Sequence, residues 1–276
     1  MYERVTVPVD GSPFAETVIP YALGLARAMK ARLAFLRIVE ERAADAAEEY
    51  LRGLADRLGA ERTLLLAEAK PASVILQQME KRPNDLLAMT THGRGGVLES
   101  LLGSVALHVV RESLRPLVVY RPREAAKGDG LGEAVKISTV IAPVDGSDFS
   151  ERILVVAAGM AKAIGAGLTL LQAVPPAGLP ASIPASDVLE SSYVRRTAEK
   201  VEHEYGIDAD WEVLHGPAGD AISDYAKGQT GVLLAMSSHA RTGLKQTILG
   251  SVTAECLRRS GAPILVFGPG QPRAAE

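Results

Sequence analysis

The chain carries the same two motifs twice. The pentapeptide P-V-D-G-S occurs at 8–12 and again at 143–147, an offset of 135 residues. A longer motif reads T-T-H-G-R-G-G-V-L-E-S-L-L-G-S at 90–104 and S-S-H-A-R-T-G-L-K-Q-T-I-L-G-S at 237–251, an offset of 147 residues. Both offsets are far longer than the repeat unit of a solenoid. The sequence therefore predicts two copies of one domain, the second with about twelve extra residues between the motifs.

Apolar, strand-like runs alternate with helical patterns in both copies. The first copy has predicted strands at 5–9, 32–39, 62–67, 85–89 and 116–120, and predicted helices at 14–29, 43–58, 71–80 and 105–111. The second copy has predicted strands at 140–144, 209–214, 231–236 and 263–267, predicted helices at 188–205 and 218–227, and a proline-rich insertion at 175–187. This alternation predicts an α/β fold in which helices cover both faces of a parallel sheet.

A stretch rich in charges, prolines and glycines separates the two copies. Such a composition is typical of a linker between domains. We expect a first domain at 1–122, a linker at 123–136, a second domain at 137–270 and a tail at 271–276. The total length of 276 residues suits two domains of ordinary size.

Composition argues against several classes of partner. A net charge of −3 and a pI near 6.0 speak against a nucleic-acid-binding face. No apolar run reaches membrane-spanning length, and the N-terminus lacks the basic and apolar regions of a signal peptide, so no membrane partner is expected. The lone cysteine, Cys256, excludes a disulfide framework within the chain and fits a reducing compartment. We therefore expect a cytoplasmic protein.

The longer motif is a candidate anion-binding loop. It follows a predicted strand and ends in Gly-Ser at a predicted helix start, at Gly103-Ser104 and at Gly250-Ser251. The first turn of a helix has unpaired N–H groups and the positive end of the backbone dipole, and glycine lets a phosphate approach closely. Ser104 and Ser251 could cap the helix or donate to a phosphate oxygen. The alternative is that Gly-Ser only starts a helix.

The aspartate of the shorter motif is a candidate ligand-binding acid. Ligands of doubly wound sheets bind outside the carboxyl ends of the strands, where the winding reverses. If the first and fourth strands are neighbours, Asp10 and Asp145 face the loops, and each carboxylate could accept hydrogen bonds from a sugar hydroxyl or a base amine. The alternative is that each aspartate caps the following turn. Loop and aspartate together indicate a nucleotide site.

These residues resemble the ATP-binding type of the universal stress protein family, in a tandem arrangement that covers nearly the whole chain. The loop signature of that family is glycine, two residues, glycine, nine residues, glycine, and serine or threonine. The matching residues are Gly93, Gly103 and Ser104 in the first copy and Gly250 and Ser251 in the second. Thr90, Ser237 and Ala240 stand where the signature has glycine.

The resemblance implies a fold and a function. It implies two doubly wound, Rossmann-like domains, each with a five-stranded parallel sheet of order 3-2-1-4-5. It also implies ATP binding, dimerisation through the last strands and a role in stress. Asp10 and Asp145 match the nucleotide-contacting acid, and Val39 and Val174, at the ends of the second strands, are implied to contact the adenine ring.

The two sites are expected to differ in affinity. If the second glycine position needs a positive φ, the backbone strain at Ala240 costs about 1–2 kcal/mol. This strain could weaken nucleotide binding by the second copy about tenfold. Arg94 and Arg241 follow that position and could neutralise phosphate charge, although a solvated loop arginine is the alternative. His92 and His239 are expected to form hydrogen bonds within the loops. We therefore expect the first copy to hold the stronger site.

Three enzymatic alternatives fit the residues poorly. Gly93-Arg94-Gly95 begins like a dinucleotide fingerprint, but the third glycine position is Leu98. The chain has no Gly-Lys pair, which excludes a P-loop NTPase. A triad of Asp10, His92 and Ser104 lacks the G-x-S-x-G elbow.

The sequence thus predicts an adenine-nucleotide-binding regulator of the stress response. The residues do not distinguish ATP from ADP, AMP or a cyclic nucleotide, and Mg²⁺ is expected only with ATP. One alternative is an interaction module with degenerate clefts, whose apolar strands at 117–120 and 264–267 pair with each other or with another chain as a homodimer. A weak ATPase is the other alternative.

Overall fold

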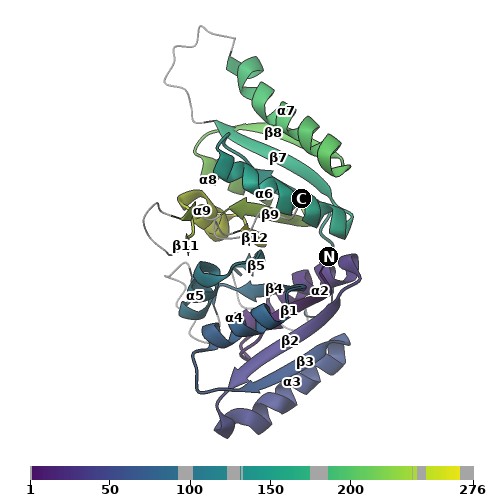
Figure 1. Cartoon of the computed structure of the whole chain (residues 1–276), viewed down its shortest axis with the longest axis vertical. Helices are drawn as coiled ribbons and strands as arrows, with labels where there is room; N and C mark the ends of the chain where they lie inside the picture. Colours follow the sequence, from purple (N-terminus) through teal and green to yellow (C-terminus); the bar gives the residue numbers. More distant parts are fainter. Residues whose placement is uncertain are drawn as a thin grey trace.

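The computed structural model describes residues 2–92, 102–122, 131, 133–174, 186–237, 239–240 and 247–267. These residues form one continuous sheet of ten strands with helices on its faces (Figure 1). Repeat 1 contributes β1 (Arg4–Pro8), α1 (Pro13–Glu16), α2 (Ile19–Met29), β2 (Arg32–Val39), α3 (Ala44–Leu58), β3 (Glu61–Leu66), α4 (Pro71–Lys81), β4 (Asp85–Thr90), α5 (Ser104–Glu112) and β5 (Leu117–Tyr120).

Repeat 2 has the same alternation, with one helix in place of α1 and α2 and with two short additional strands, β10 and β11. It comprises β6 (Thr139–Pro143), α6 (Asp148–Ile164), β7 (Gly167–Val174), α7 (Ser186–Tyr205), β8 (Ala209–His215), α8 (Ala218–Lys227), β9 (Val232–Ser237), β10 (His239–Ala240), β11 (Thr247–Ile248), α9 (Ser251–Arg259) and β12 (Ile264–Phe267). Most of the proline-rich insertion, residues 175–185, lies outside the described residues.

The strand order confirms the predicted fold of each repeat. The sheet runs β3-β2-β1-β4-β5-β12-β9-β6-β7-β8, so each half has the order 3-2-1-4-5. Neighbouring strands are parallel within each half, and the single antiparallel pair of this sheet joins β5 to β12. Every residue of β4 is buried, as expected for a central strand of a parallel sheet with both faces covered.

The prediction of one helix over 14–29 is wrong, because α1 and α2 are separate helices. Pro20 has no N–H with which to bond the Glu16 carbonyl, so the helix cannot continue through this turn. Instead, the backbone N–H of Thr17 donates to the Phe14 carbonyl at 3.2 Å, and its hydroxyl donates to the same oxygen at 2.7 Å. The chain therefore turns at Thr17 before α2 begins.

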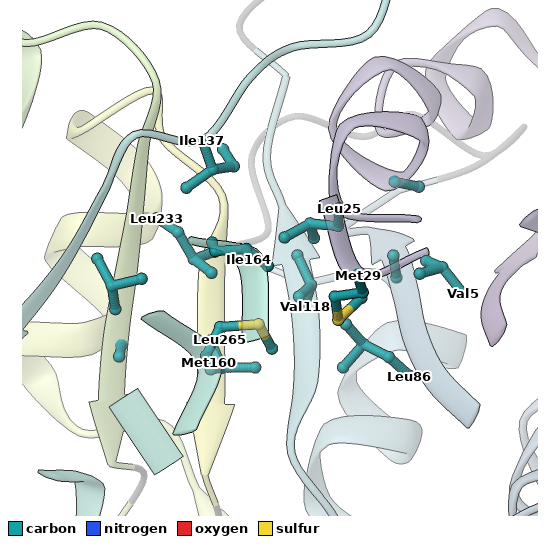
Figure 2. Packing of buried hydrophobic residues seen from close by; sticks show 14 of the residues in the cluster. Val5, Leu25, Met29, Leu86, Val118, Ile137, Met160, Ile164, Leu233 and Leu265 are labelled. Atoms are coloured by element: carbon teal, nitrogen blue, oxygen red, sulfur yellow. The ribbon is translucent and has the colours of Figure 1, made fainter. Parts of the chain in front are cut away.

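The two repeats share their hydrophobic cores. One cluster of buried side chains extends through α2, α3, α6 and α7, and a second lies on the opposite face of the sheet. Figure 2 shows the first cluster at the junction, where Val118 of β5 and Leu265 of β12 are register partners in the antiparallel pair. Of the two pairings considered for these terminal strands, the structure shows the one between repeats.

The C-terminal end of the predicted linker packs against repeat 1. Leu131 and Ile137 are buried in the first cluster, and the backbone N–H of Val135 donates to the Pro20 carbonyl at 2.9 Å. Gly24 of α2 permits this approach, because a Cβ atom there would lie 1.8 Å from the Val135 carbonyl oxygen. Among the described residues, no helix is long and apolar enough to cross a bilayer.

Candidate nucleotide clefts

The candidate clefts lie at the two points where the winding of the sheet reverses. In repeat 1 the chain moves outward from β1 to β2 and β3, then returns to the other side of β1 as β4. β1 and β4 are parallel neighbours, so Asp10 and the loop after Thr90 follow adjacent carboxyl ends. β6 and β9 repeat this arrangement for Asp145 and Ser237. Ligands of doubly wound folds bind at such edges.

Asp10 closes a turn at the end of β1. Its Oδ1 accepts a hydrogen bond from the backbone N–H of Ser12 at 2.9 Å, across Gly11 with φ of 80°. Ser12 in turn caps α1, because its Oγ accepts from the backbone N–H of Ala15 at 3.2 Å. Asp10 is half-buried and, as the turn-capping alternative expects, one oxygen of its carboxylate caps the turn. The turn holds the carboxylate in place at the mouth of the cleft.

Asp145 forms the same turn in repeat 2, with an additional bond. Its Oδ1 accepts from the backbone N–H of Ser147 at 3.0 Å and from the hydroxyl of Ser147 at 2.6 Å. Partial desolvation acts to raise the pKa of Asp145, but hydrogen bonds from Ser147 and Ser150 outweigh it and lower that pKa below its usual value. The ionised carboxylate is thus favoured at this turn.

Buried polar side chains follow β4 in repeat 1. The Thr90 hydroxyl donates to the His92 carbonyl at 2.8 Å, and His92 Nδ1 lies 2.9 Å from the Thr91 hydroxyl. The backbone N–H of Thr91 donates to the Tyr120 carbonyl at 2.9 Å, which ties the loop to β5. His92 is 7% exposed and therefore supports the base of the loop.

The helix start in repeat 1 differs from the predicted serine cap. Gly103 is the N-cap of α5, Ser104 is the first helical residue, and no side chain caps the helix. Within the part of the chain that the structure describes, the first-turn N–H groups thus have no capping side chain, an arrangement suited to an anionic ligand. Glycine fits this position most easily, because a Cβ atom at Gly103 would lie in tight contact, 3.2 Å, with the Thr91 carbonyl oxygen.

The helix start in repeat 2 has the same cap but a different loop. Gly250 is the N-cap of α9 and Ser251 the first helical residue, again without a side-chain cap. His239 and Ala240 form β10, which pairs with β11 as an antiparallel hairpin. Ala240 is extended, a conformation that alanine adopts without strain, so the predicted positive-φ penalty does not arise.

The remaining candidate residues divide into two groups. The Val39 carbonyl accepts from the backbone N–H of Ala67 at 3.0 Å, and the Val174 carbonyl accepts from Gly216 at 2.9 Å, so both strand ends are held by the sheet. Gly93, Arg94 and Arg241 lie outside the described residues.

Comparison with known proteins identifies the family. The sequence model described as "Universal stress protein family" matches residues 1–121 and 136–268. The chain belongs to the universal stress protein family. Universal stress protein MJ0531 of Methanocaldococcus jannaschii is 29% identical over 135 residues, 46% of this chain and 79% of that protein. Universal stress protein Rv2005c of Mycobacterium tuberculosis is 27% identical over 220 residues, 76% of this chain and 72% of that protein.

A solved structure has the same tandem fold. The universal stress protein from Archaeoglobus fulgidus superposes with a TM-score of 0.70 at 20% identity, covering 98% of this chain and 100% of that one. The resemblance drawn from the two motifs is thereby confirmed at the level of family and fold.

In this universal stress protein, sequence reasoning missed a tyrosine–glutamate pair beside each strand-end aspartate. Tyr50 of α3 donates to Glu16 of α1 at 2.5 Å, and Tyr193 of α7 donates to Glu151 of α6 at 2.9 Å. Desolvation, together with the neighbouring glutamate, raises the pKa of Tyr193 to about 12 and raises that of Tyr50 further. Both tyrosines therefore remain neutral donors at physiological pH.

One signal could have revealed these pairs. Glu16 and Glu151 are 135 residues apart, the same offset as the aspartates, so an alignment of the two copies places them together. Arg37 has no such counterpart, because Gln172 occupies its position in repeat 2. The Arg37 guanidinium lies 4.7 Å from the centre of the Tyr50 ring. Repeat 1 thus has a buried guanidinium beside Tyr50, at a position where repeat 2 has the neutral Gln172.

Proposed function

We propose that this chain binds an adenine nucleotide, ATP above all, in the cleft of repeat 1 and acts as a nucleotide-responsive regulator of the stress response. The observation that carries the proposal is the start of α5. Gly103 opens a helix whose first turn has no side-chain cap, next to the strand end that carries Asp10. First-turn N–H groups suit phosphates, and an acid suits a sugar hydroxyl or a base amine.

The proposal assigns the cleft residues by their position. Gly103 and Ser104 would receive phosphate oxygens, with Gly93 and Arg94 on the same loop. Asp10 would accept from the ribose or the base, and Val39 would lie against adenine. His92 and Thr90 would support the loop from below, since both are buried and bonded within it.

Repeat 2 is proposed as the weaker site. Its loop lacks two signature glycines, at Ser237 and Ala240, and the β10–β11 hairpin commits backbone groups to strand pairing. Backbone N–H groups used in this way are not available to a phosphate. Gly250, Ser251, Asp145 and Val174 retain the positions of their counterparts in repeat 1.

The structure favours this function over the interaction-module alternative. That alternative drew support from β5 and β12 as strands open to a partner. Both strands are central in the sheet and are buried against each other. A homodimer would have to form through a different surface.

Isothermal titration of the nucleotide-stripped protein with ATP tests the proposal. We expect saturable binding in the parent and its loss from repeat 1 in Gly103→Val, because the branched side chain would crowd the Thr91 carbonyl and the His92 ring and displace the start of α5. Gly53→Val is the matched control, since a Cβ at Gly53 of α3 meets no atom within 4 Å. Circular dichroism would verify that each variant is folded. Absence of ATP binding in the parent, or unchanged binding in folded Gly103→Val, would contradict the proposal.

A further inference from the structure

The short strand β11 of repeat 2 lies against repeat 1. β11 packs against α5, the helix whose start forms the proposed phosphate site of repeat 1 (Figure 1). Leu249 directly follows β11 and packs against the second hydrophobic cluster, which joins Leu102, Ala106 and Val109 of repeat 1 to Met236 and Cys256 of repeat 2. The hairpin of one repeat is therefore joined by contact and by a shared core to the binding helix of the other.

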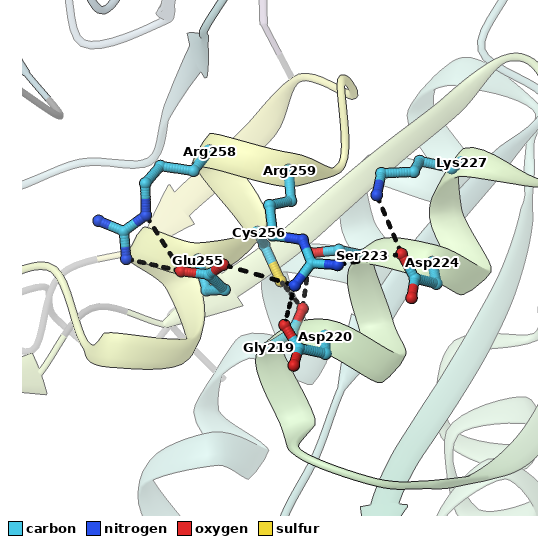
Figure 3. Close-up of polar contacts among 9 residues, drawn as sticks. All are labelled: Gly219, Asp220, Ser223, Asp224, Lys227, Glu255, Cys256, Arg258 and Arg259. Carbon is cyan, nitrogen blue, oxygen red and sulfur yellow. Dashed lines mark hydrogen bonds and ion pairs between the residues drawn. The ribbon is translucent and has the colours of Figure 1, made fainter. Parts of the chain in front are cut away.

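α9 of repeat 2 is held in place by charges (Figure 3). Arg259 of α9 forms an ion pair with Asp220 of α8, and its Nη2 lies 3.6 Å from Asp224 of the same helix. Close helix packing accompanies these pairs, because a Cβ atom at Gly219 would lie 2.7 Å from Glu255 Cβ. α9 is thus anchored within its own repeat.

α5 of repeat 1 lacks this anchor. At the offset of 147 residues, the counterparts of Asp220, Asp224 and Arg259 are Ser73, Gln77 and Glu112. The structure describes α4 and α5 completely, and no ion pair joins these two helices. α5 is therefore held by the backbone hydrogen bond from Gly103 to Thr91 at 2.8 Å and by apolar packing, to which repeat 2 contributes.

We propose that the repeat 2 loop, folded as the β10–β11 hairpin, braces α5 and thereby positions the nucleotide site of repeat 1. This inference rests on the proposed function for its effect on affinity. Leu249 is the positioning residue that the structure singles out, because it links the hairpin to the shared cluster. The loop that lacks two signature glycines would then support the loop that lacks only one.

Leu249→Ala tests the brace in the full-length protein, with Leu214→Ala as its control. Leu214 is also a partly buried leucine of repeat 2 packed on the same cluster, but it lies in β8, at the outer edge of the sheet. Two measurements are made on each variant: hydrogen exchange of the α5 amides without nucleotide, and titration with ATP. The isotherm lost in Gly103→Val identifies binding to repeat 1.

Leu249→Ala is expected to accelerate exchange in α5 selectively and to weaken ATP binding to repeat 1 about five- to tenfold. Leu214→Ala should change neither. Unchanged exchange in α5 of Leu249→Ala, or exchange accelerated equally throughout the protein, would overturn the inference. If the parent binds no ATP, the proposed function fails, and the exchange measurement alone decides whether the hairpin braces α5.

Discussion

At the scale of single residues, the strand-end aspartates combine a structural and a proposed binding role, and one substitution separates them. Asparagine at position 10 can still accept from the Ser12 N–H, so Asp10→Asn should keep the turn. It should weaken ATP binding about ten- to hundredfold, because a charged acceptor is lost. Titration calorimetry and a thermal melt measure the two effects. Asp56→Asn, an exposed acid of α3, is the charge-matched control.

Unchanged ATP affinity in folded Asp10→Asn would limit Asp10 to its role in the turn. A loss of thermal stability comparable to the loss of affinity would also assign the effect of the substitution to the turn. The sequence alone does not decide between capping of the turn and ligand binding, because the two oxygens of one carboxylate can serve both roles.

Asp145 should contribute to stability in a pH-dependent manner. Its pKa is lowered in the folded state, so its stabilising effect is fully present above its unfolded value of about 3.9 and is lost as the pH falls through the folded pKa. The difference in free energy of unfolding between the parent and Asp145→Asn should therefore be constant near neutral pH and shrink in acid. Because Asp145 is exposed, the difference should be small. Urea titrations across this range would detect it; a pH-independent difference would contradict the assignment.

At the scale of secondary-structure elements, α2 depends on one glycine for its contact with the linker. In Gly24→Ala the new methyl group would collide with the Val135 carbonyl, which is backbone and is held by the bond from Val135 to Pro20. We expect the free energy of unfolding to fall by about 1–3 kcal/mol, as in other overpacked sites. Urea denaturation measures the change.

Gly53→Ala of α3 is the control for helix propensity. It lies in a helix interior with no atom within 4 Å of a new Cβ, so alanine should stabilise by up to about 1 kcal/mol. Changes of opposite sign in the free energy of unfolding of Gly24→Ala and Gly53→Ala would establish that the linker contact causes the destabilisation at Gly24. Stabilisation by both would mean that the linker moves away at little cost.

The elements that could be predicted are those with local signals. β1, β2 and β4 are apolar runs bounded by polar or glycine residues, and their predicted limits differ from the observed ones by a residue or so. The break between α1 and α2 is not visible in the apolar periodicity of 14–29; its signal is Pro20, which stands in the first turn of α2. The β10–β11 hairpin could not be predicted, because strands of two residues each are too short to give an alternating pattern.

At the scale of the whole molecule, the two repeats form one structure. Strand order within each repeat could be inferred from family resemblance, but the β5–β12 pair could not be assigned, because an apolar edge strand is equally compatible with pairing to a second chain. The junction also includes the contact of α2 with α6, the buried linker residue Leu131 and the buried Ile137 directly after the linker. These contacts give both repeats a common core.

A shared core predicts that both repeats unfold together. Leu51 of α3 is completely buried in repeat 1, so Leu51→Ala should cost about 2–5 kcal/mol. The only tryptophan, Trp211, lies in β8 at the far edge of repeat 2 and reports on that repeat by fluorescence. If the repeats are one cooperative unit, Leu51→Ala shifts the urea midpoint seen by Trp211 as much as the midpoint seen by circular dichroism.

The junction provides the complementary variant. Leu265 of β12 is also completely buried, and it pairs with Val118 across the repeats. Leu265→Ala should either lower both midpoints together or, if the weakened junction uncouples the repeats, separate the fluorescence and circular dichroism transitions. A Trp211 transition that Leu51→Ala leaves in place, in a protein with an intact junction, would show two independent domains. Because the proposed brace on α5 transmits through this same junction, uncoupled repeats would also remove the physical basis for communication between the clefts.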